Sequence, residues 1–138
     1  MMKQLKVYVS HCIRGKKGSK ATREYIQRNV TLAILFGQAL RREFPNIDFY
    51  VPGDHEYPPV GNLLEKGYVT IDQVLAVDCD ILKNCNFVVA FSPNGYLSKG
   101  MKKEIEYAEE NGIPVIIVSK LYKSGIASIN RQIQESIR

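Results

Sequence analysis

Two acidic residues interrupt the apolar faces of two segments that have helical spacing. Asp78 lies three residues after Leu75 and four before Leu82, and Glu104 lies three residues after Met101. Residues three or four apart share one face of a helix, so each carboxylate should point toward the protein interior. Burying an ionised carboxylate costs several kcal/mol unless it is paired or hydrogen-bonded. A shared site, where both acids serve one reaction, would explain both placements.

A structural explanation of these two acids is also open. Each could lie at the edge of its apolar stripe or pair with a lysine such as Lys102 or Lys103. The other acids of the same segments fall on polar faces and are expected in solvent: Asp80, Glu106, Glu109 and Glu110.

Two further segments combine glycine with groups that bind anions. Arg14, Gly15 and Gly18 lie in a loop between a strand-like and a helix-like segment, where backbone amides and a guanidinium can face an anion. The loop is not a Walker motif, because no Gly-Lys-Ser/Thr is present. Ser98 and Gly100 open the second acidic helix, whose N-terminal amides and dipole favour negative charge. For Ser98, a simple N-cap is the alternative.

Positive charge gathers at the same two places. The formal net charge is +5, and its residues cluster at Arg14, Lys16, Lys17, Lys20 and Arg23, and again at Lys99, Lys102 and Lys103. Both clusters flank the starts of expected helices, which favours a local anion site over a long nucleic-acid groove. Plain solvated surface is the alternative for each lysine. With no recognition-helix motif and no basic tail, we expect no nucleic-acid partner.

The pattern along the chain predicts a doubly wound α/β fold. Strands are expected at 5–9, 47–51, 87–91 and 114–118, and helices at 21–44, 70–84, 98–112 and from 126 to the C-terminus. Thr70 and Gln73 have capping-box spacing, Pro45 should end the first helix, and Gly112 suits the left-handed closing position of the third. Alternating strands and helices imply a mostly parallel sheet of four to five strands with helices on both faces.

The segment 52–67 is rich in proline and glycine and is expected to be an irregular loop. In doubly wound folds ligands bind beyond the carboxyl ends of the strands. The candidate site should therefore lie among the loops 10–20, 52–67 and 92–99.

Bulk properties set further limits. A chain of 138 residues is long enough for one core and predicts a single domain over 1–138. Its apolar runs are too short to span a membrane, and no signal sequence precedes them, so we expect a cytoplasmic protein without a membrane partner. Cys12, Cys79 and Cys85 lack metal spacing and are expected to be free thiols. We expect neither a metal nor a cofactor.

Together these residues resemble the nucleoside 2-deoxyribosyltransferase superfamily, most closely its 2'-deoxynucleoside 5'-phosphate N-hydrolase branch. The similar segments run in order through most of the chain: Val7 to Val9, Cys12 to Gly15, Asp78 to Ala90, Ser98 to Ala108, and Gly112 to Val115. Their order and spacing are more specific than any one of them.

The resemblance implies a role for each part of the site. Glu104 would be the catalytic carboxylate at the anomeric carbon, as nucleophile or as stabiliser of an oxocarbenium-like transition state, with Tyr8 orienting it and Asp78 serving the leaving base. Residues at matching positions hold the 5'-phosphate of the substrate: Arg14, Gly15, Ser98 and Gly100. Similar enzymes are dimers or higher homo-oligomers that take a phosphate-binding serine from the neighbouring subunit, for which Ser128 is the candidate. The resemblance assigns no role to Asp54, His55, Glu56 and Tyr57.

The sequence thus predicts an enzyme of nucleotide metabolism, an N-glycosidase that hydrolyses the base–sugar bond of a (deoxy)nucleoside 5'-monophosphate. Cleavage of this bond needs an acid near the leaving group and a carboxylate near the developing positive charge. Transfer of the deoxyribosyl group to another base is the first alternative. A non-catalytic protein that binds or senses a nucleotide in the same pocket is the second, although such a protein has little need of Tyr8, Asp78 and Glu104 together.

Overall fold

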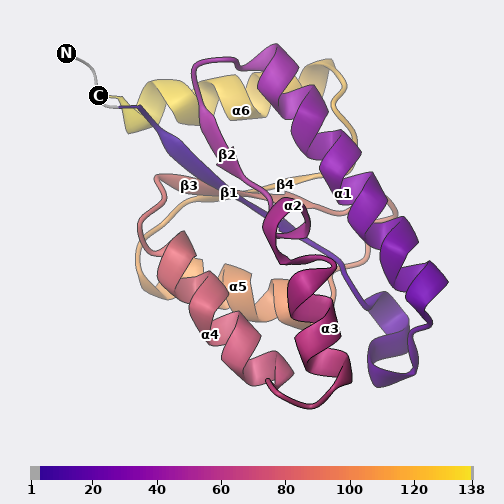
Figure 1. The fold of residues 1–138 in the computed structure, drawn as a ribbon. Coiled ribbons are helices and arrows are strands. Elements are labelled where there is room, and N and C mark those ends of the chain that lie inside the picture. Colours follow the sequence, from indigo (N-terminus) through magenta and orange to yellow (C-terminus); the bar gives the residue numbers. More distant parts are fainter. Residues whose placement is uncertain (1–3, 138) are drawn as a thin grey trace.

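The computed structural model describes residues 4–137 and confirms the expected fold class (Figure 1). Its sheet has four strands, all parallel, in the order β2-β1-β3-β4. The strands are β1 (Lys6–His11), β2 (Asp48–Tyr50), β3 (Phe87–Phe91) and β4 (Val115–Val118). All four predicted strands are therefore present, with ends within two residues of the prediction.

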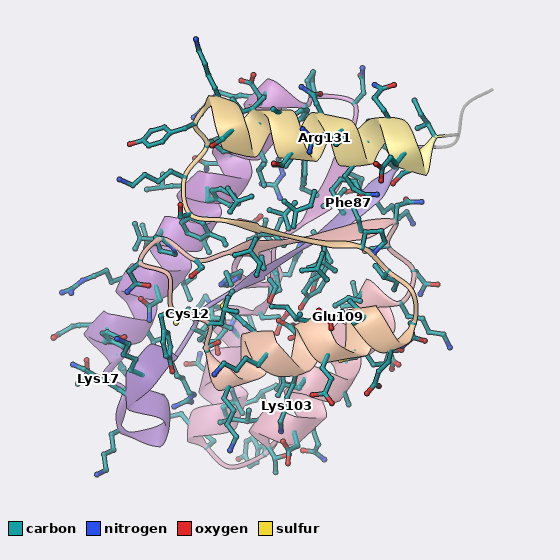
Figure 2. All side chains as sticks on the ribbon, turned by 180° about the vertical axis from the view of Figure 1, so that it is seen from behind. Cys12, Lys17, Phe87, Lys103, Glu109 and Arg131 are labelled. Atoms are coloured by element: carbon teal, nitrogen blue, oxygen red, sulfur yellow. The ribbon has the colours of Figure 1, made fainter. Side chains whose placement is uncertain are left out.

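One face of the sheet is covered by α1 (Arg23–Glu43) and α6 (Lys123–Ser136). The larger core lies there, where Phe36 of α1 stacks on Phe91 with ring centroids 4.1 Å apart and Ile129 of α6 is fully buried. Figure 2 shows Phe87 between the sheet and α6. Helix α6 begins three residues before the predicted start at 126, after the N-cap Tyr122.

The other face carries α4 (Ile71–Leu82) and α5 (Lys99–Glu110), which pack on a smaller core. Tyr8, Leu82 and Ala108 are fully buried in it. The predicted capping box of Thr70 and Gln73 begins α4, and Gly112 follows α5 with the positive φ of 68° that was expected for it. The two acidic helices thus lie side by side on one face of the sheet, below it in Figure 1.

The predicted irregular loop at 52–67 is wrong. The chain forms two short helices there, α2 (Pro52–Glu56) and α3 (Pro59–Glu65). Each has its proline in the first turn, where the ring fits the helical φ and the missing N–H would have no helical partner in any case. Proline therefore starts these helices instead of interrupting them.

The strand order places a crevice beside β1. The chain leaves β1 toward β2 on one side and later returns through β3 on the other, so the connections after β1 and β3 diverge at the carboxyl edge of the sheet. The short 3₁₀ segment η1 (Gly15–Lys20) follows β1, and α5 follows β3. Within residues 4–137, no helix is both long enough and apolar enough to cross a membrane.

Candidate active site

A pocket with a volume of about 420 Å³ opens at this carboxyl edge. That is within the range of small-molecule sites, roughly 300–1,000 Å³. Three groups of residues line it: His11, Ile13, Arg14, Gly15 and Gly18 from the end of β1 onward; Pro52, Tyr57, Leu64, Ile71, Asp72, Val74, Leu75 and Asp78 from α2 to α4; and Ser98, Lys99, Gly100, Met101, Lys103 and Glu104 from the N-cap and the body of α5. The three loops expected around the site all contribute to it.

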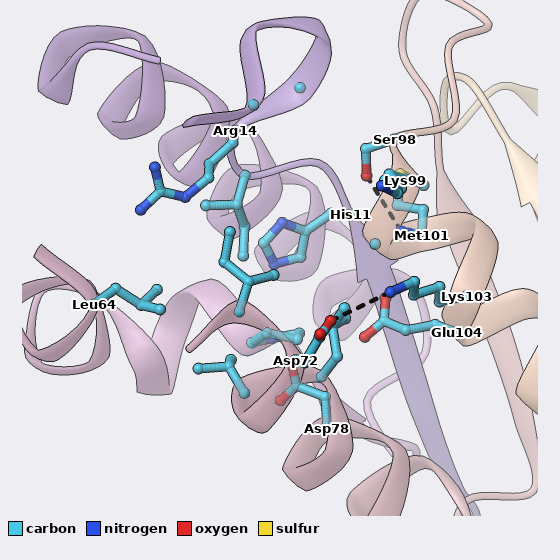
Figure 3. Close-up of a pocket in the computed structure, with 18 of the residues that line it drawn as sticks. His11, Arg14, Leu64, Asp72, Asp78, Ser98, Lys99, Met101, Lys103 and Glu104 are labelled. Carbon is cyan, nitrogen blue, oxygen red and sulfur yellow. Dashed lines mark hydrogen bonds and ion pairs between the residues drawn. The ribbon is translucent and has the colours of Figure 1, made fainter. Parts of the chain in front are cut away.

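The pocket has two chemically different ends (Figure 3). Arg14 and Ser98 lie at one end, on opposite sides, whereas Asp78 and Glu104 lie together at the other end, and His11 stands between. The apolar side chains of α3 and α4 form a third side. The arrangement suits a ligand with an anionic group at one end and an apolar, flat group near the acids.

The predicted burial of Asp78 and Glu104 is confirmed. Each side chain is only 5% exposed. Neither pairs with a lysine: Lys103 instead bridges to Asp72 across the mouth of the pocket, at 3.3 Å. The structural explanation by ion pairing therefore does not apply to either acid among the described residues.

Glu104 is held by two hydroxyl groups from β1. The Tyr8 hydroxyl donates to Oε2 and the Ser10 hydroxyl donates to Oε1 at 2.7 Å. Both donors are fully buried and face α5, because residues two apart on a strand share a face. Burial raises the pKa of Glu104 to about 7, although the two hydrogen bonds act in the opposite direction. The contact between Tyr8 and Glu104 that the family resemblance implies is present, but burial raises the pKa of Glu104 more than the hydrogen bonds lower it.

Asp78 has an unexpected acidic neighbour, Glu56 of α2. Glu56 is 7% exposed, and burial together with the hydrogen bond and negative charge of Asp78 raises its pKa to about 9. Burial also raises the pKa of Asp78. Three carboxyl groups therefore gather at the acidic end.

Within residues 4–137, no group of His, Cys, Asp and Glu side chains has an arrangement that could hold a metal ion.

The opposite end carries the predicted anion-binding groups. Arg14 lines the pocket beside Gly15, whose φ of 61° and close contact with Tyr25 exclude a side chain there. Ser98 caps α5 by accepting a hydrogen bond from the Met101 amide at 3.2 Å, so the N-cap alternative holds. It also lines the pocket, as does Gly100. The positive end of the α5 dipole thus faces the same space as Arg14.

Two lysines near Arg14 lie over aromatic rings and do not line the pocket. The Lys16 ammonium lies 5.1 Å from the centre of the Tyr96 ring, and Lys17 lies 4.7 Å from that of Tyr25. Neither lines the pocket. The basic cluster predicted around Arg14 therefore presents Arg14 itself to the pocket, and its lysines shape the surrounding surface.

Ser128 is not part of this pocket within one chain. It lies on α6, on the face of the sheet opposite α4 and α5, and its hydroxyl donates to the Ser124 carbonyl at 3.0 Å. The prediction that Ser128 reaches the site of a neighbouring subunit stays a prediction.

The contacts of His11 and Cys12 indicate structural roles for both residues. His11 is buried, its Nε2 accepts from the Gly53 amide at 3.0 Å, and its Nδ1 lies 3.2 Å from the Cys12 carbonyl. Burial lowers its pKa to about 4, so the ring is neutral and joins β1 to the start of α2. All three cysteines are free, as expected, and burial raises the pKa of the Cys12 thiol, which disfavours a reactive thiolate.

Sequence reasoning missed Ser10 and Glu56. Ser10 could have been found, because it follows Tyr8 by two residues and must face the same helix as Tyr8. Glu56 gives no such signal, since α2 has five residues and no apolar period. Its burial follows from the packing of α2 against the carboxyl edge of the sheet.

A comparison with protein-family models finds no match to this chain, and a search of the curated proteins finds no significant one. The family resemblance therefore rests on the sequence motifs and stays a proposal.

Proposed function

We propose that this chain is an N-glycosidase that hydrolyses the bond between the base and the sugar of a (deoxy)nucleoside 5'-monophosphate. The observation that best supports this function is the polarity of the pocket, with Arg14 and the N-terminus of α5 at one end and buried Asp78 and Glu104 at the other. A nucleotide has the matching polarity, with its phosphate and its base on opposite sides of the sugar.

In the proposed complex the phosphate lies between Arg14 and the amides of Ser98 to Gly100. A charge-assisted bond from a guanidinium and the dipole of a helix both favour this group. The base packs against the apolar side chains of α3 and α4, including Leu64 and Leu75. The sugar then lies above Glu104, and the binding energy of the remote phosphate fixes it there.

Glu104 acts on the anomeric carbon. As the bond to the base breaks, its electron pair leaves with the base nitrogen and positive charge develops at the sugar. The Glu104 carboxylate stabilises this charge or bonds to the carbon, while its hydrogen bonds to Tyr8 and Ser10 keep both oxygens in place. Asp78 gives a proton to the departing base. Water completes the reaction at the anomeric carbon.

The proposal is tested with purified protein and a panel of ribo- and deoxynucleoside 5'-monophosphates, each with and without an added free base. Base release is followed by chromatography. Release of free base and sugar phosphate is the expected result. A new nucleotide that forms only with added base would assign the chain as a transferase. If no nucleotide is cleaved while one still raises the melting temperature, the chain is a binding protein and the proposed reaction is wrong.

A further inference from the structure

Glu56 is a buried carboxyl group without a partner for one of its oxygens. Within residues 4–137, its Oε1 is the one buried side-chain oxygen or nitrogen that has no hydrogen-bond donor. Its Oε2 accepts a long bond, 3.4 Å, from the Tyr50 hydroxyl. An ionised carboxylate in this environment would lose most of its solvation with little in return.

Besides the Tyr50 hydroxyl, the carboxyl group of Asp78 also comes within hydrogen-bonding reach of Glu56. Two carboxyl groups can form a hydrogen bond only when one of them carries a proton, because a pair of carboxylates offers acceptors alone. The unpartnered oxygen and the adjacent acid thus have one common explanation, a proton held between them.

The charged and titratable groups around Glu56 are Tyr8 on β1, Tyr50 on β2, the neighbouring Tyr57, Asp78 on α4 and Glu104 on α5. The negative charges of Asp78 and Glu104 disfavour the ionisation of Glu56, whereas the hydrogen bond from Tyr50 favours it with a smaller effect on the pKa. No lysine or arginine among the described residues contributes to its pKa. The proton is therefore retained at neutral pH, when an exposed glutamate has lost it.

We propose that Glu56 and Asp78 form an acid pair that shares one proton, with Asp78 delivering this proton to the departing base and Glu56 acting as the positioning residue that keeps it available. The inference rests on the proposed function and adds a residue to it. Asp78 lines the pocket and can touch the base, whereas buried Glu56 is not among the lining residues and acts through Asp78.

The proton that the acid pair gives to the base is replaced by a proton from water, so the reaction leaves the pair unchanged. When the bond between the sugar and the base breaks, the base nitrogen keeps the electron pair and takes the proton of the pair through Asp78. The pair is left as two adjacent buried carboxylates, which repel each other. Water then bonds to the anomeric carbon, and its proton returns to the pair. The pair thus acts first as an acid and then as a base, as expected for a glycosidase.

A purely structural role for Glu56, as a bond between α2 and α4, makes a different prediction about leaving groups. Only a proton donor helps a poor leaving group more than a good one. The two roles are separated by comparing a purine deoxynucleoside 5'-monophosphate with 4-nitrophenyl 2-deoxyriboside 5-phosphate, whose phenolate leaves without a proton.

The variant is Glu56→Gln, which keeps the size of the side chain and a hydrogen-bond donor for Asp78. Glu65→Gln is the matched control, because Glu65 lies on the adjacent helix α3, outside the pocket, and pairs with exposed Arg23. We expect Glu56→Gln to lower kcat for the nucleotide about 100-fold with little change in KM, and to leave cleavage of the nitrophenyl substrate within about 3-fold. Equal losses for both substrates, or no loss for the nucleotide, overturn the inference.

The shared proton is also measured without turnover. At about pH 8, between the pKa of Glu104 near 7 and that of Glu56 near 9, infrared spectroscopy of the free protein should show a protonated carboxyl band. The band should disappear in Glu56→Gln and remain in Glu65→Gln. Absence of the band from the unaltered protein refutes the acid pair, whether or not a nucleotide is cleaved. Failure of cleavage with the band present refutes the proposed reaction instead.

Discussion

Tyr8 and Tyr50 are register partners on neighbouring parallel strands, with ring centroids 5.7 Å apart, and each donates its hydroxyl proton to a different buried acid. Tyr8 holds Glu104 and Tyr50 holds Glu56. The sheet thereby fixes both ends of the acidic cluster from the same pair of strand positions. In the proposed mechanism, Tyr8 bonds to the carboxylate that must be ionised, and Tyr50 bonds to a member of the acid pair that must hold a proton.

The pH profile of kcat/KM should be bell-shaped. Glu104 must be ionised, so kcat/KM should rise with pH through about 7, the pKa to which burial raises this group. The acid pair must keep its proton, so kcat/KM should fall through about 9. Steady-state base release measured across this range tests the prediction. A flat profile, or a fall in rate between these two values, contradicts the assignment of the two roles.

Removing the two tyrosine hydroxyls should move opposite limbs of this bell. The hydrogen bond from Tyr8 lowers the pKa of Glu104, so Tyr8→Phe raises that pKa and moves the acidic limb to higher pH. The bond from Tyr50 lowers the pKa of Glu56, so Tyr50→Phe moves the alkaline limb to higher pH. Each variant is the control for the other in the same pH series. Shifts of both limbs together would mean that the two acids do not have separate roles.

Arg14 should contribute to binding of the phosphate and little else. Arg14→Ala is expected to raise KM for a nucleoside 5'-monophosphate by roughly 10- to 100-fold, the value of a hydrogen bond to a charged group. Activity on the same nucleoside without its phosphate should not change. Arg23→Ala is the control, since Arg23 forms an exposed ion pair with Glu65 outside the pocket. Equal effects of Arg14→Ala on both substrates would remove Arg14 from the phosphate site.

The free energy of unfolding should depend on pH because of the proton that Glu56 holds in the folded protein. In the unfolded chain Glu56 loses its proton near the ordinary pKa of 4.5, whereas in the folded protein it keeps the proton up to about 9. Between these values the folded state binds the additional proton, so the contribution of Glu56 to the free energy of unfolding falls as pH rises. Glu56→Gln removes this dependence. As the pH rises from about 5 to about 8, the free energy of unfolding of Glu56→Gln should therefore increase by roughly 1–3 kcal/mol relative to that of the unaltered protein. Urea unfolding at several pH values measures this difference.

The sequence predicted those parts of the site that have a regular period. Asp78 and Glu104 were found because helical spacing assigns each to an apolar face, and the four strands were found from their β-branched runs. The carboxyl edge of the sheet followed from the alternation of strands and helices. These features depend on local spacing, which a single sequence displays directly.

The remaining parts depend on tertiary packing. The segment 52–67 has the composition of a loop, yet Pro52 and Pro59 each begin a short helix. The five residues of α2 have no pattern that shows Glu56 facing inward toward Asp78. This contact joins two residues that are 22 positions apart in the sequence. The pKa values of the acids were likewise beyond sequence reasoning, since burial is their largest cause.

The most direct test of the account is base release by Glu104→Gln compared with Glu106→Gln, using whichever nucleoside 5'-monophosphate the unaltered protein cleaves fastest. Both residues are glutamates of α5, and Glu104 is buried in the pocket whereas Glu106 is exposed. The account predicts a loss of at least about 100-fold in kcat for Glu104→Gln and a normal rate for Glu106→Gln. Base release that persists in folded Glu104→Gln would contradict it.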